Sequence, residues 1–561
     1  MYVDTSTVRQ KGKTYTRHLL RESYRDNGKV RHRTITNLSR CSEQEVEAIK
    51  VALRHKENLK ELVSLEETLQ LRQGPSVGAL WLLYGLAKEL KIEEALGTGR
   101  QGKLALWQVI ARIIDQGSRL SAVRLASYHA VCDILGVEAF VEDDLYENLD
   151  WLSENQGRIE EDLFRRSYGE NRPVLYLYDV TSSYLEGMTN AFGAFGYNRD
   201  GKRGKKQIVL GLLCDPLGRP LSIEVFPGNT QDLATFGSQV QKVAGRFGRG
   251  EVVFVGDRGM IKGPQMEDLA SHRFHYISAL TKPQIESLLR GGVLQMSLFD
   301  EQLTEVISQD GDRYVLRCNP VRAQEIARSR QDKLASLEKA VNQYNQYLKE
   351  HLRAKVEVGK RALQEKVQKL RISEWISIEV KDRGFSVGVD PEALAEVSKL
   401  DGCYALKTDL STALADKETI HDRYKDLTLV EKAFRTCKTV QLEMRPIHVR
   451  LEERTRGHAF VVMLAYRMTQ ELAKRWSHLN LTVQEGIDQL ATLCSEQVII
   501  NGKPHGYKIP QPDQLLKGLF EAAAVRLPAA LPNKGVRVTT KQKLQERRKK
   551  GGSSPKSDHE K

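Results

Sequence analysis

The sequence lacks the long apolar runs and the paired cysteines that mark membrane proteins and disulfide-stabilised proteins. Its most apolar run, Ala79 to Ala87, ends at Lys88 and is far shorter than the roughly 20 residues that a membrane-spanning helix needs. Met1 to Asp4 do not begin a secretory signal. The seven cysteines are scattered without a C-x-x-C pair, which is typical of reduced thiols in a cytoplasmic protein rather than a disulfide framework or a zinc site.

The length and the charge distribution say more. A chain of 561 residues exceeds the roughly 250–300 residues at which one hydrophobic core stops growing, so we expect several domains. Residues 1–40 and 534–561 each hold ten Lys/Arg against three Asp/Glu, so that two excesses of seven within a net charge of +13 leave about −1 elsewhere. Basic ends favour a polyanionic partner, and a solubilising tail is the alternative for the C-terminal segment.

The first 75 residues predict a β-hairpin followed by a helix. Lys13–Arg25 and Lys29–Leu38 are rich in Tyr, Thr, Val and Ile, and they flank an Asp-Asn-Gly sequence at 26–28 that is a strong tight-turn signal. A helix is expected from Glu43 to about Leu71. The basic hairpin would bind terminal DNA, or its charged face is merely solvated.

After a mostly helical stretch at residues 76–165, the periodicity changes at Pro173 from helical to strand-like. We expect strands at Val174–Val180, Gln207–Cys214, Arg219–Phe226, Glu251–Val255, Phe274–Leu280 and Cys403–Thr408, and helices at Leu233–Phe247 and Ala415–Lys438. This order predicts a mixed α/β sheet.

From about Leu289 to residue 400 the sheet pattern stops, which predicts a large insertion. Its residues 325–370 are expected to form a long helical stretch. That stretch has an apolar seam at Leu334, Leu337, Val341, Tyr344, Leu348 and Leu352. The seam would pack within the chain or against a second copy, and we favour the former.

These patterns predict an α/β fold class, with a mixed-sheet core interrupted by an insertion domain, an N-terminal β-hairpin/helical region and C-terminal helices. The expected segments are a DNA-end-binding region at 1–75, a helical region at 76–170, the first part of the core at 171–289, the insertion domain at 290–402, the second part of the core at 403–480, a C-terminal helical region at 481–533 and a basic disordered tail at 534–561.

Three acids stand in contexts that favour catalysis. Asp179 and Asp257 lie at the ends of two apolar strands, and Glu431 lies on the helix after a third. A lone strand-end Asp is often only a helix cap or turn former, which is the alternative. Clustered carboxylates would raise one another's pKa unless a cation neutralised them. Oxygen ligands select Mg²⁺, with Mn²⁺ as a substitute, and two such ions suit phosphodiester cleavage and strand transfer.

The helix around Glu431 adds a second signal. Tyr424, Leu427, Glu431, Arg435 and Lys438 are spaced to share one helix face. Such a face would let the carboxylate hold a metal ion while the neighbouring cations hold phosphates. The alternative is an exposed ion pair between Glu431 and Arg435.

With these residues in view, the sequence resembles the bacterial insertion-sequence transposases of the DDE type. Tyr178–Ser182 and Val255–Met260 resemble the two aspartate motifs, and Gly196–Arg203 resembles the basic loop before the second strand. In the subgroup with a Y-x2-R-x3-E-x6-K helix, Tyr424, Glu431 and Lys438 fall in register, but Leu427 stands at the Arg position, and Arg435 is the candidate substitute. The resemblance covers roughly residues 170–480 and more weakly the N-terminal hairpin.

The resemblance implies an RNase H-like core and a cut-and-paste transposase. Asp179, Asp257 and Glu431 would be the catalytic residues and the ligands of two Mg²⁺ ions. Hydrolysis would nick the transposon end, and the freed 3′-hydroxyl would attack the other strand or target DNA. The partners would be terminal inverted repeats, target DNA and a second copy in a homodimeric synaptic complex, with no membrane partner, in the bacterial cytoplasm at the nucleoid.

Basic residues around the acids would contact DNA. The candidates are Arg199, Lys202, Arg203, Lys205, Lys206, Arg258, Tyr424, Arg435 and Lys438. A solvated loop is the alternative for the five basic residues at 199–206. Downstream, Arg445-Pro446 and Arg454-x-Arg456-Gly457-His458 also resemble the family, and His458 would contact DNA or cap a turn. The rival functions are an RNase H-like endonuclease without joining activity and a catalytically inactive DNA-binding repressor.

Overall fold

The computed structural model divides the chain into two compact units. It describes residues 1–10, 13–57, 69–248, 251–258, 260–309, 311–439, 441–445, 447–500, 502–531, 535–536 and 538. The first unit combines residues 1–75, 494–511 and 528–533, and the second combines residues 76–493, 512–527 and 534–561. Almost all of the basic tail expected from residue 534 onward therefore lies outside the described residues.

The first unit contains two antiparallel sheets. The predicted hairpin is confirmed as β2 (Lys13–Asp26) and β3 (Lys29–Asn37), and the unpredicted strand β1 (Tyr2–Gln10) pairs with the other side of β2. Helix α1 covers only Glu43–Arg54. The helix expected to reach Leu71 is wrong at its end, because β4 (Leu69–Ser76) begins two residues earlier; residues 58–68 lie outside the described residues.

Strand β4 belongs to a sheet whose other strands come from the C-terminal part of the chain. The order is β17-β16-β15-β4, with β15 at Cys494–Ile500, β16 at Lys503–Lys508 and β17 at Ala530–Leu531. The region 481–533 is therefore not simply helical, although it contains α18 (Val483–Ala491) and α19 (Gln514–Ala522). A pairing between segments more than 400 residues apart leaves no local periodicity from which to predict it.

The second unit begins with a group of helices, as expected. They are α3 (Gly78–Glu89), α4 (Ile92–Leu96), α5 (Arg100–Ile114), α6 (Arg119–Tyr128), α7 (Val131–Leu135) and α8 (Glu142–Tyr168). None of the helices in the described ranges combines the length and the apolar character needed to cross a membrane. Helix α8 packs against α17 (Glu452–Arg475), and this contact joins the helical group to the C-terminal part of the core.

Gly457 sets how closely α17 approaches α8. A Cβ atom at Gly457 would lie 2.2 Å from the backbone oxygen of Leu149, so Gly457→Ala must separate the helices. We expect a loss of about 1–3 kcal/mol in the free energy of unfolding, as for other overpacked cores. Urea denaturation would measure it, with Gly518→Ala as the matched control, because a Cβ at this glycine of α19 meets nothing within 4 Å. Equal stability of the two variants would contradict the close packing.

The core of the second unit is an eight-stranded mixed sheet in the order β10-β11-β14-β9-β8-β5-β6-β7. Its main strands are β5 (Leu175–Tyr184), β6 (Gln207–Cys214), β7 (Pro220–Pro227), β8 (Val252–Gly256), β9 (Phe274–Ala279) and β14 (Cys403–Thr408). Strands β5, β6 and β7 form an antiparallel meander, and β8 and β9 run parallel to β5. This arrangement is the expected RNase H-like mixed sheet.

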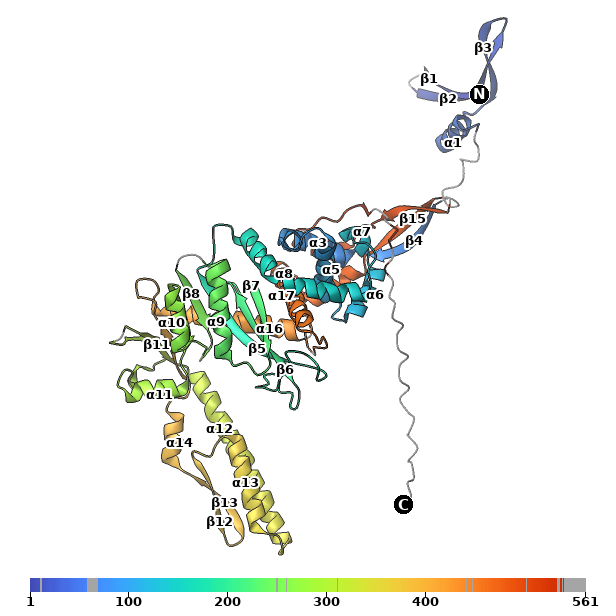
Figure 1. Cartoon of the computed structure of the whole chain (residues 1–561). Helices are drawn as coiled ribbons and strands as arrows, with labels where there is room; N and C mark the ends of the chain where they lie inside the picture. Colours follow the sequence, from blue (N-terminus) through green and yellow to red (C-terminus); the bar gives the residue numbers. More distant parts are fainter. Residues whose placement is uncertain are drawn as a thin grey trace. The chain divides into compact units, whose positions relative to one another are not determined.

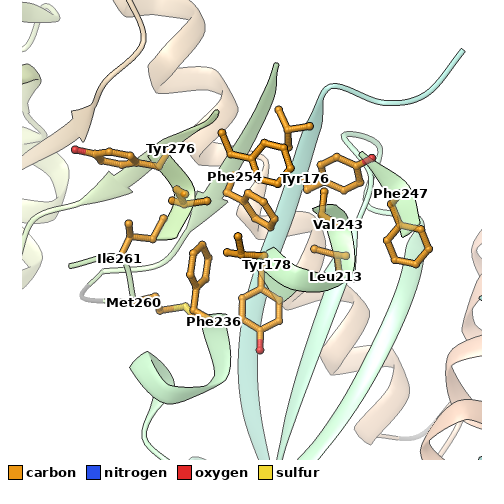
Figure 2. Packing of buried hydrophobic residues seen from close by; sticks show 14 of the residues in the cluster. Tyr176, Tyr178, Leu213, Phe236, Val243, Phe247, Phe254, Met260, Ile261 and Tyr276 are labelled. Carbon is orange, nitrogen blue, oxygen red and sulfur yellow. The ribbon is translucent and has the colours of Figure 1, made fainter. Parts of the chain in front are cut away.

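Alternate residues of β5 face opposite sides of the sheet. Tyr176 and Tyr178 pack into an apolar cluster with Phe254 of β8, Phe236 of α9 (Asp232–Lys242) and Phe247 of the following π-helical turn, as Figure 2 shows. Helix α16 (Leu427–Lys438) also contacts β5. Asp179 lies between Tyr178 and Val180, which both belong to this cluster. Its side chain therefore points to the opposite face of the sheet.

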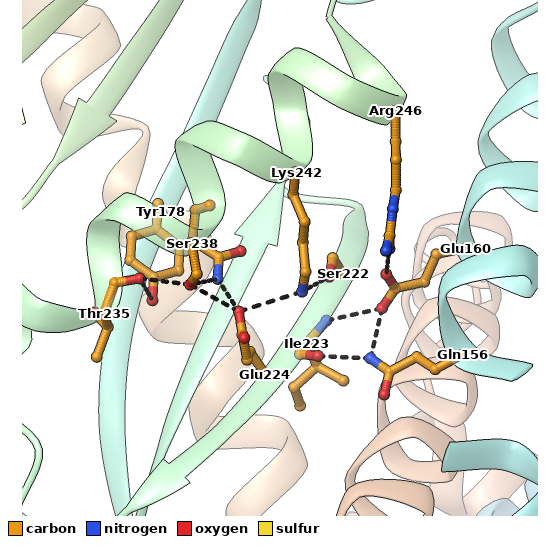
Figure 3. A network of polar contacts seen from close by, with 11 residues as sticks. Gln156, Glu160, Tyr178, Ser222, Ile223, Glu224, Thr235, Ser238, Lys242 and Arg246 are labelled. Atoms are coloured by element: carbon orange, nitrogen blue, oxygen red, sulfur yellow. Dashed lines mark hydrogen bonds and ion pairs between the residues drawn. The ribbon is translucent and has the colours of Figure 1, made fainter. Parts of the chain in front are cut away.

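Helix α8 also covers the open edge of the sheet at β7. The Gln156 side chain donates to the Ile223 carbonyl at 2.7 Å and to Glu160 at 2.7 Å, and the Ile223 N–H donates to Glu160 at 3.4 Å. Lys242 and Arg246 extend this network from the other side (Figure 3). Burial raises the pKa of Glu160. These bonds satisfy edge groups that would otherwise be open to pairing with another strand.

The insertion begins later than expected. Strands β10 (Thr304–Ile307) and β11 (Arg313–Cys318) continue the core sheet, because β11 pairs with β14, so the expectation that the sheet pattern stops at Leu289 is wrong. Both strands are short and carry charged residues such as Arg313, which hide the apolar pattern. The segment between β11 and β14 holds the part that leaves the sheet.

That part contains two helices rather than one. Helices α12 (Pro320–Glu350) and α13 (Val356–Leu370) pack on each other and on the hairpin of β12 (Ile376–Lys381) and β13 (Gly384–Val389), followed by α14 (Pro391–Ser398) (Figure 1). The predicted seam is buried in this cluster, so it packs within the chain, as favoured. Leu352 is 78% exposed, because it lies past the end of α12.

Candidate active site

Two neighbouring parallel strands bring Asp179 and Asp257 to the same edge of the sheet. In the pairing of β5 with β8, Tyr178 is opposite Gly256. Asp179 and Asp257 are the next residues along the two chains, so they leave the strand pair at the same level. Asp179 is half-buried, whereas Asp257 is exposed just beyond the end of β8. The sequence prediction that both strands deliver an acid at one place is consistent with this register.

Helix α16 adds the third acid. Its apolar side is buried through Val430, Ala433 and Phe434, and Glu431 lies on the exposed side. Asp179, Asp257 and Glu431 together line a pocket of about 400 Å³, which we call the acid pocket. Six basic or acidic neighbours complete the charged part of its lining: Arg199, Asp200, Asp232, Arg435, Lys438 and Arg445.

The electrostatics of Asp179 reflect this clustering. Burial is the main cause that raises its pKa to about 7, and the carboxylates of Asp257 and Glu431 raise it further. The N–H of Val180, which donates to Asp179 Oδ1 at 2.7 Å, and the charge of Arg199 oppose the rise. Near pH 7 a carboxyl group with this pKa is present in both its protonated and its charged form. A nearby cation lowers the pKa and favours the charged form.

The acid pocket suits a divalent cation in the chemistry of its donors. Three carboxylates offer hard oxygen ligands, which Mg²⁺ and Mn²⁺ prefer, and a cation beside Asp179 would offset the burial and the neighbouring carboxylates that raise its pKa. Across the described ranges, no group of three or more His, Cys, Asp or Glu side chains is already gathered closely enough to ligate one ion. The mutual repulsion of the carboxylates opposes such a gathering unless a cation binds.

Tyr424 and Glu431 do not lie on one continuous helix. The expected helix from Ala415 to Lys438 is divided into α15 (Lys417–Lys425) and α16, with Asp426 between them. The Tyr424 hydroxyl donates to Asp257 Oδ1 at 3.2 Å, and burial raises the pKa of Tyr424, so that the group remains a donor. Tyr424 thus orients the second aspartate from a separate helix.

The predicted common face of the helix is also only partly present. Leu427 and Lys438 are buried, whereas Glu431 and Arg435 are exposed. The alternative of a Glu431–Arg435 ion pair is not found among the salt bridges of the described residues. Arg435 and Glu431 both line the acid pocket without such a pairing.

Lys438 is held inside the protein. Its ammonium group donates to Thr181 Oγ1 and to the Ser182 carbonyl, both at 2.9 Å, and pairs with Asp200 at 2.8 Å. Arg445 contacts the same Asp200 oxygen, and Asp200 accepts from the Tyr184 N–H at 3.1 Å. Burial lowers the pKa of Lys438, and Asp200 opposes this. The three donors of Lys438 are used in fixing the end of β5 to the basic loop.

The other predicted DNA-contacting cations differ in whether their side chains already have a partner within the protein. Arg199 donates to both oxygens of Asp232, and Lys205 pairs with Glu186 at 2.7 Å. Lys206 donates to the Met188 carbonyl at 3.1 Å, and Lys202 lies over the Tyr184 ring. Arg203 and Arg258 are exposed. Lys202 and Arg203 thus remain accessible on the loop, as does Arg258 beside Asp257.

Sequence reasoning assigned no role to Asp200, Asp232 or Arg445. Asp200 and Arg445 stand in segments that were singled out, and Asp200 precedes a glycine with a φ of +69°. An acid inside an otherwise basic loop was the available signal, since such an acid often has a buried cationic partner. Asp232 is the first residue of α9. Nothing in its sequence context predicts its ion pair with Arg199.

The raised pKa of Asp179 predicts a pH dependence of stability without metal ions. Between about pH 4 and pH 7 the native state binds a proton that the unfolded chain lacks, so the free energy of unfolding falls as the pH rises through this window. The stability advantage of Asp179→Asn over the unchanged protein should therefore be larger at pH 8 than at pH 5, by on the order of a few kcal/mol. Urea denaturation in EDTA at the two pH values would measure this, and a difference that does not change with pH would contradict it.

Comparisons with known proteins agree with this geometry. Residues 171–468 match the family model of the transposase DDE domain, and residues 3–67 match that of the IS1634 family transposase N-terminal domain. No match was found among curated proteins.

Two solved structures are similar to the chain. One is the piggyBac transposase in a synaptic complex with hairpin DNA, with 10% identity, a TM-score of 0.36, and coverage of 75% of this chain and 82% of that chain. The other is the Mos1 transposase in a paired-end complex with the left transposon end, with 14% identity, a TM-score of 0.13, and coverage of 32% of this chain and 58% of that chain.

Proposed function

Since the chain belongs to the family of DDE transposases, we propose that it cleaves DNA at the ends of its insertion sequence and joins them to target DNA by a cut-and-paste route. The observation that carries this proposal is the acid pocket: Asp179, Asp257 and Glu431 line one cavity, and burial, with smaller contributions from Asp257 and Glu431, raises the pKa of Asp179. Structural acids of a fold are usually dispersed or paired with cations, whereas these three line one cavity together with Arg199 of the basic loop.

In this proposal, Asp179, Asp257 and Glu431 hold divalent cations, Mg²⁺ in the first place. Bound there, such cations supply Lewis-acid activation of the attacking oxygen and neutralise the charge of the leaving oxygen. The Tyr424 hydroxyl keeps Asp257 turned toward the pocket. Lys438 and Arg445 hold Asp200, and with it the basic loop, beside the end of β5. The rigid sheet and these contacts fix the direction of the acids before DNA arrives.

The exposed cations would bind the DNA backbone. We assign this role to the exposed residues Arg258, Arg435, Lys202 and Arg203, and to Arg199, Lys205 and Lys206 after exchange of their present partners for phosphates. Contacts of this kind position a strand without reading its sequence. We infer that the N-terminal unit, with its basic strands, recognises the terminal inverted repeats, and that two copies pair the ends.

An assay of cleavage and joining would test the proposal. The full chain is incubated with a linear DNA that carries the inverted repeats flanking its own gene, with a target plasmid, in Mg²⁺, in Mn²⁺ and in EDTA. We expect ends cut at the repeat boundary and joined products in the presence of either metal and none in EDTA. Cut ends without joined products would favour the endonuclease alternative, and binding without any product would favour the repressor.

A further inference from the structure

A second pocket lies beside the acid pocket, and most of its charged lining residues are arginines. It measures about 660 Å³ and shares Arg445 with the acid pocket. We call it the arginine pocket. Its basic lining residues are Arg112, Arg119, Arg445, His448, Arg450, Arg454 and His458, and Glu443 is the one carboxylate in the lining. The end of α5, the start of α6, the segment 443–451 and α17 contribute these side chains.

Two arginines of this pocket are buried without a bound carboxylate. Arg112 is 6% exposed and Arg119 is 5% exposed, and neither takes part in any ion pair of the described chain. Arg119 donates to the Gln108 side chain and to His458 Nδ1 at 3.0 Å. Arg112 donates to the carbonyls of Gln116 and Gly117, while its Nε atom is buried with no hydrogen-bond partner in the described structure. Buried charge without a counter-charge is unfavourable.

The electrostatics of the pair agree with a missing anion. Burial and then the charge of Arg112 lower the pKa of Arg119 to about 9. Burial lowers the pKa of Arg112 to about 10, and the more distant charges of Asp115 and Glu443 offset only part of this. Both guanidinium groups therefore remain charged at neutral pH while repelling each other. An anion placed between them would remove the repulsion and the cost of burial together.

His458 explains how Arg119 is held. Burial lowers the pKa of His458 well below its usual value, so that the ring stays neutral and its Nδ1 can accept from Arg119. At the preceding residue, Gly457, a Cβ atom would meet the backbone of Leu149 on α8. His458 is thus a positioning residue for Arg119.

We propose that the arginine pocket binds a backbone phosphate of the DNA strand that enters the acid pocket. The inference rests on the proposed function and adds a second anchoring point to it. Guanidinium groups match the geometry of phosphate oxygens through paired N–H donors, and the start of α6 adds the partial positive charge of a helix N-terminus. Phosphates of one strand repeat about every 3.4 Å along the duplex axis, so adjoining pockets hold phosphates only a few nucleotides apart.

Neutral-phosphate DNA would test the site directly. End duplexes with a single methylphosphonate, moved one linkage at a time along both strands near the cleavage site, are bound to the full chain in EDTA, and fluorescence anisotropy gives each Kd. We expect one or two linkages at which neutralisation weakens binding about 10-fold, as for loss of a charged hydrogen bond. At those linkages, neutralising the phosphate should weaken DNA binding by Arg450→Gln and by Arg119→Lys only slightly. Arg450→Gln removes a charge and should also lower the salt slope by about 1, whereas Arg119→Lys keeps the charge and should leave the slope unchanged.

The comparison among variants separates a phosphate site from a structural role. Arg456→Gln is the matched control, because Arg456 lies on α17 but pairs with Glu452 at 2.6 Å and is not part of the pocket lining; it should keep the sensitivity of the unchanged protein. Arg450 is exposed, so its variant tests the site even if Arg119→Lys lowers the melting temperature. If both variants weaken binding equally at every linkage, the proposal is overturned. Absence of end binding and of cleavage in the unchanged protein would instead refute the proposed function.

Discussion

Asp257→Ala is expected to abolish DNA-strand cleavage while end binding stays largely intact. Asp257 is exposed at the end of β8, so its loss removes no buried contact of the fold. In the proposed function it removes one of three carboxylates that hold the cations, and we expect the cleavage rate to fall by at least about 10³-fold, which corresponds to ~4 kcal/mol of transition-state stabilisation. Denaturing gels measure cleavage, and gel shifts on the same end DNA measure binding.

Glu267→Gln is the matched control for this variant. Glu267 is an exposed acid on α10 (Gly263–Ser271), ten residues further along the chain, and it does not line the acid pocket. Its replacement changes the net charge by the same amount and should leave cleavage unchanged. If Asp257→Ala cleaves end DNA at the rate of the control, Asp257 is not part of the catalytic centre and the assignment of all three acids must be withdrawn.

The position of the two aspartates in the candidate site could be predicted because each has a signal in its own short segment. An apolar strand that ends in an acid is visible in one short segment, and the parallel register of β5 and β8 follows from the rule that connected parallel strands align in an α/β sheet. Glu431 was found because a helix pattern and a family motif coincide. Each of these inferences depends on residues close together in the sequence.

The parts of the fold that failed depend on distant partners. Strand β4 exists because β15 pairs with it, and the strand pair β10–β11 exists because β14 completes it. The break at Asp426 separates two helices that have continuous helical periodicity, and Tyr424 contacts Asp257 from the first of them. Such contacts override local preference and are not readable from a single sequence.

The same limit applies to Lys438, which was predicted to contact DNA and is instead surrounded by Thr181, Ser182 and Asp200. We expect Lys438→Met to lower the free energy of unfolding by about 3 kcal/mol, because it leaves the side chain of Asp200, which is only 2% exposed, with less compensating charge. Urea denaturation would measure the loss. The double variant Lys438→Met/Asp200→Asn should recover part of it, since the buried carboxylate that has lost Lys438 is neutralised, although Arg445 then loses its charged partner.

A comparison with Lys432→Met then decides between the two roles of Lys438. Lys432 is exposed on the same helix, so its replacement removes one charge without a buried partner and should change stability by less than about 0.5 kcal/mol. If Lys438 positions the loop, Lys438→Met loses both stability and cleavage activity. The double variant then regains more of its stability than of its cleavage activity. If Lys438 were a phosphate contact instead, both single variants would unfold alike, and only Lys438→Met would weaken end binding and lower its salt slope by about 1. The Lys438 ammonium group is buried and contacts three acceptors within the protein, which favours the positioning role.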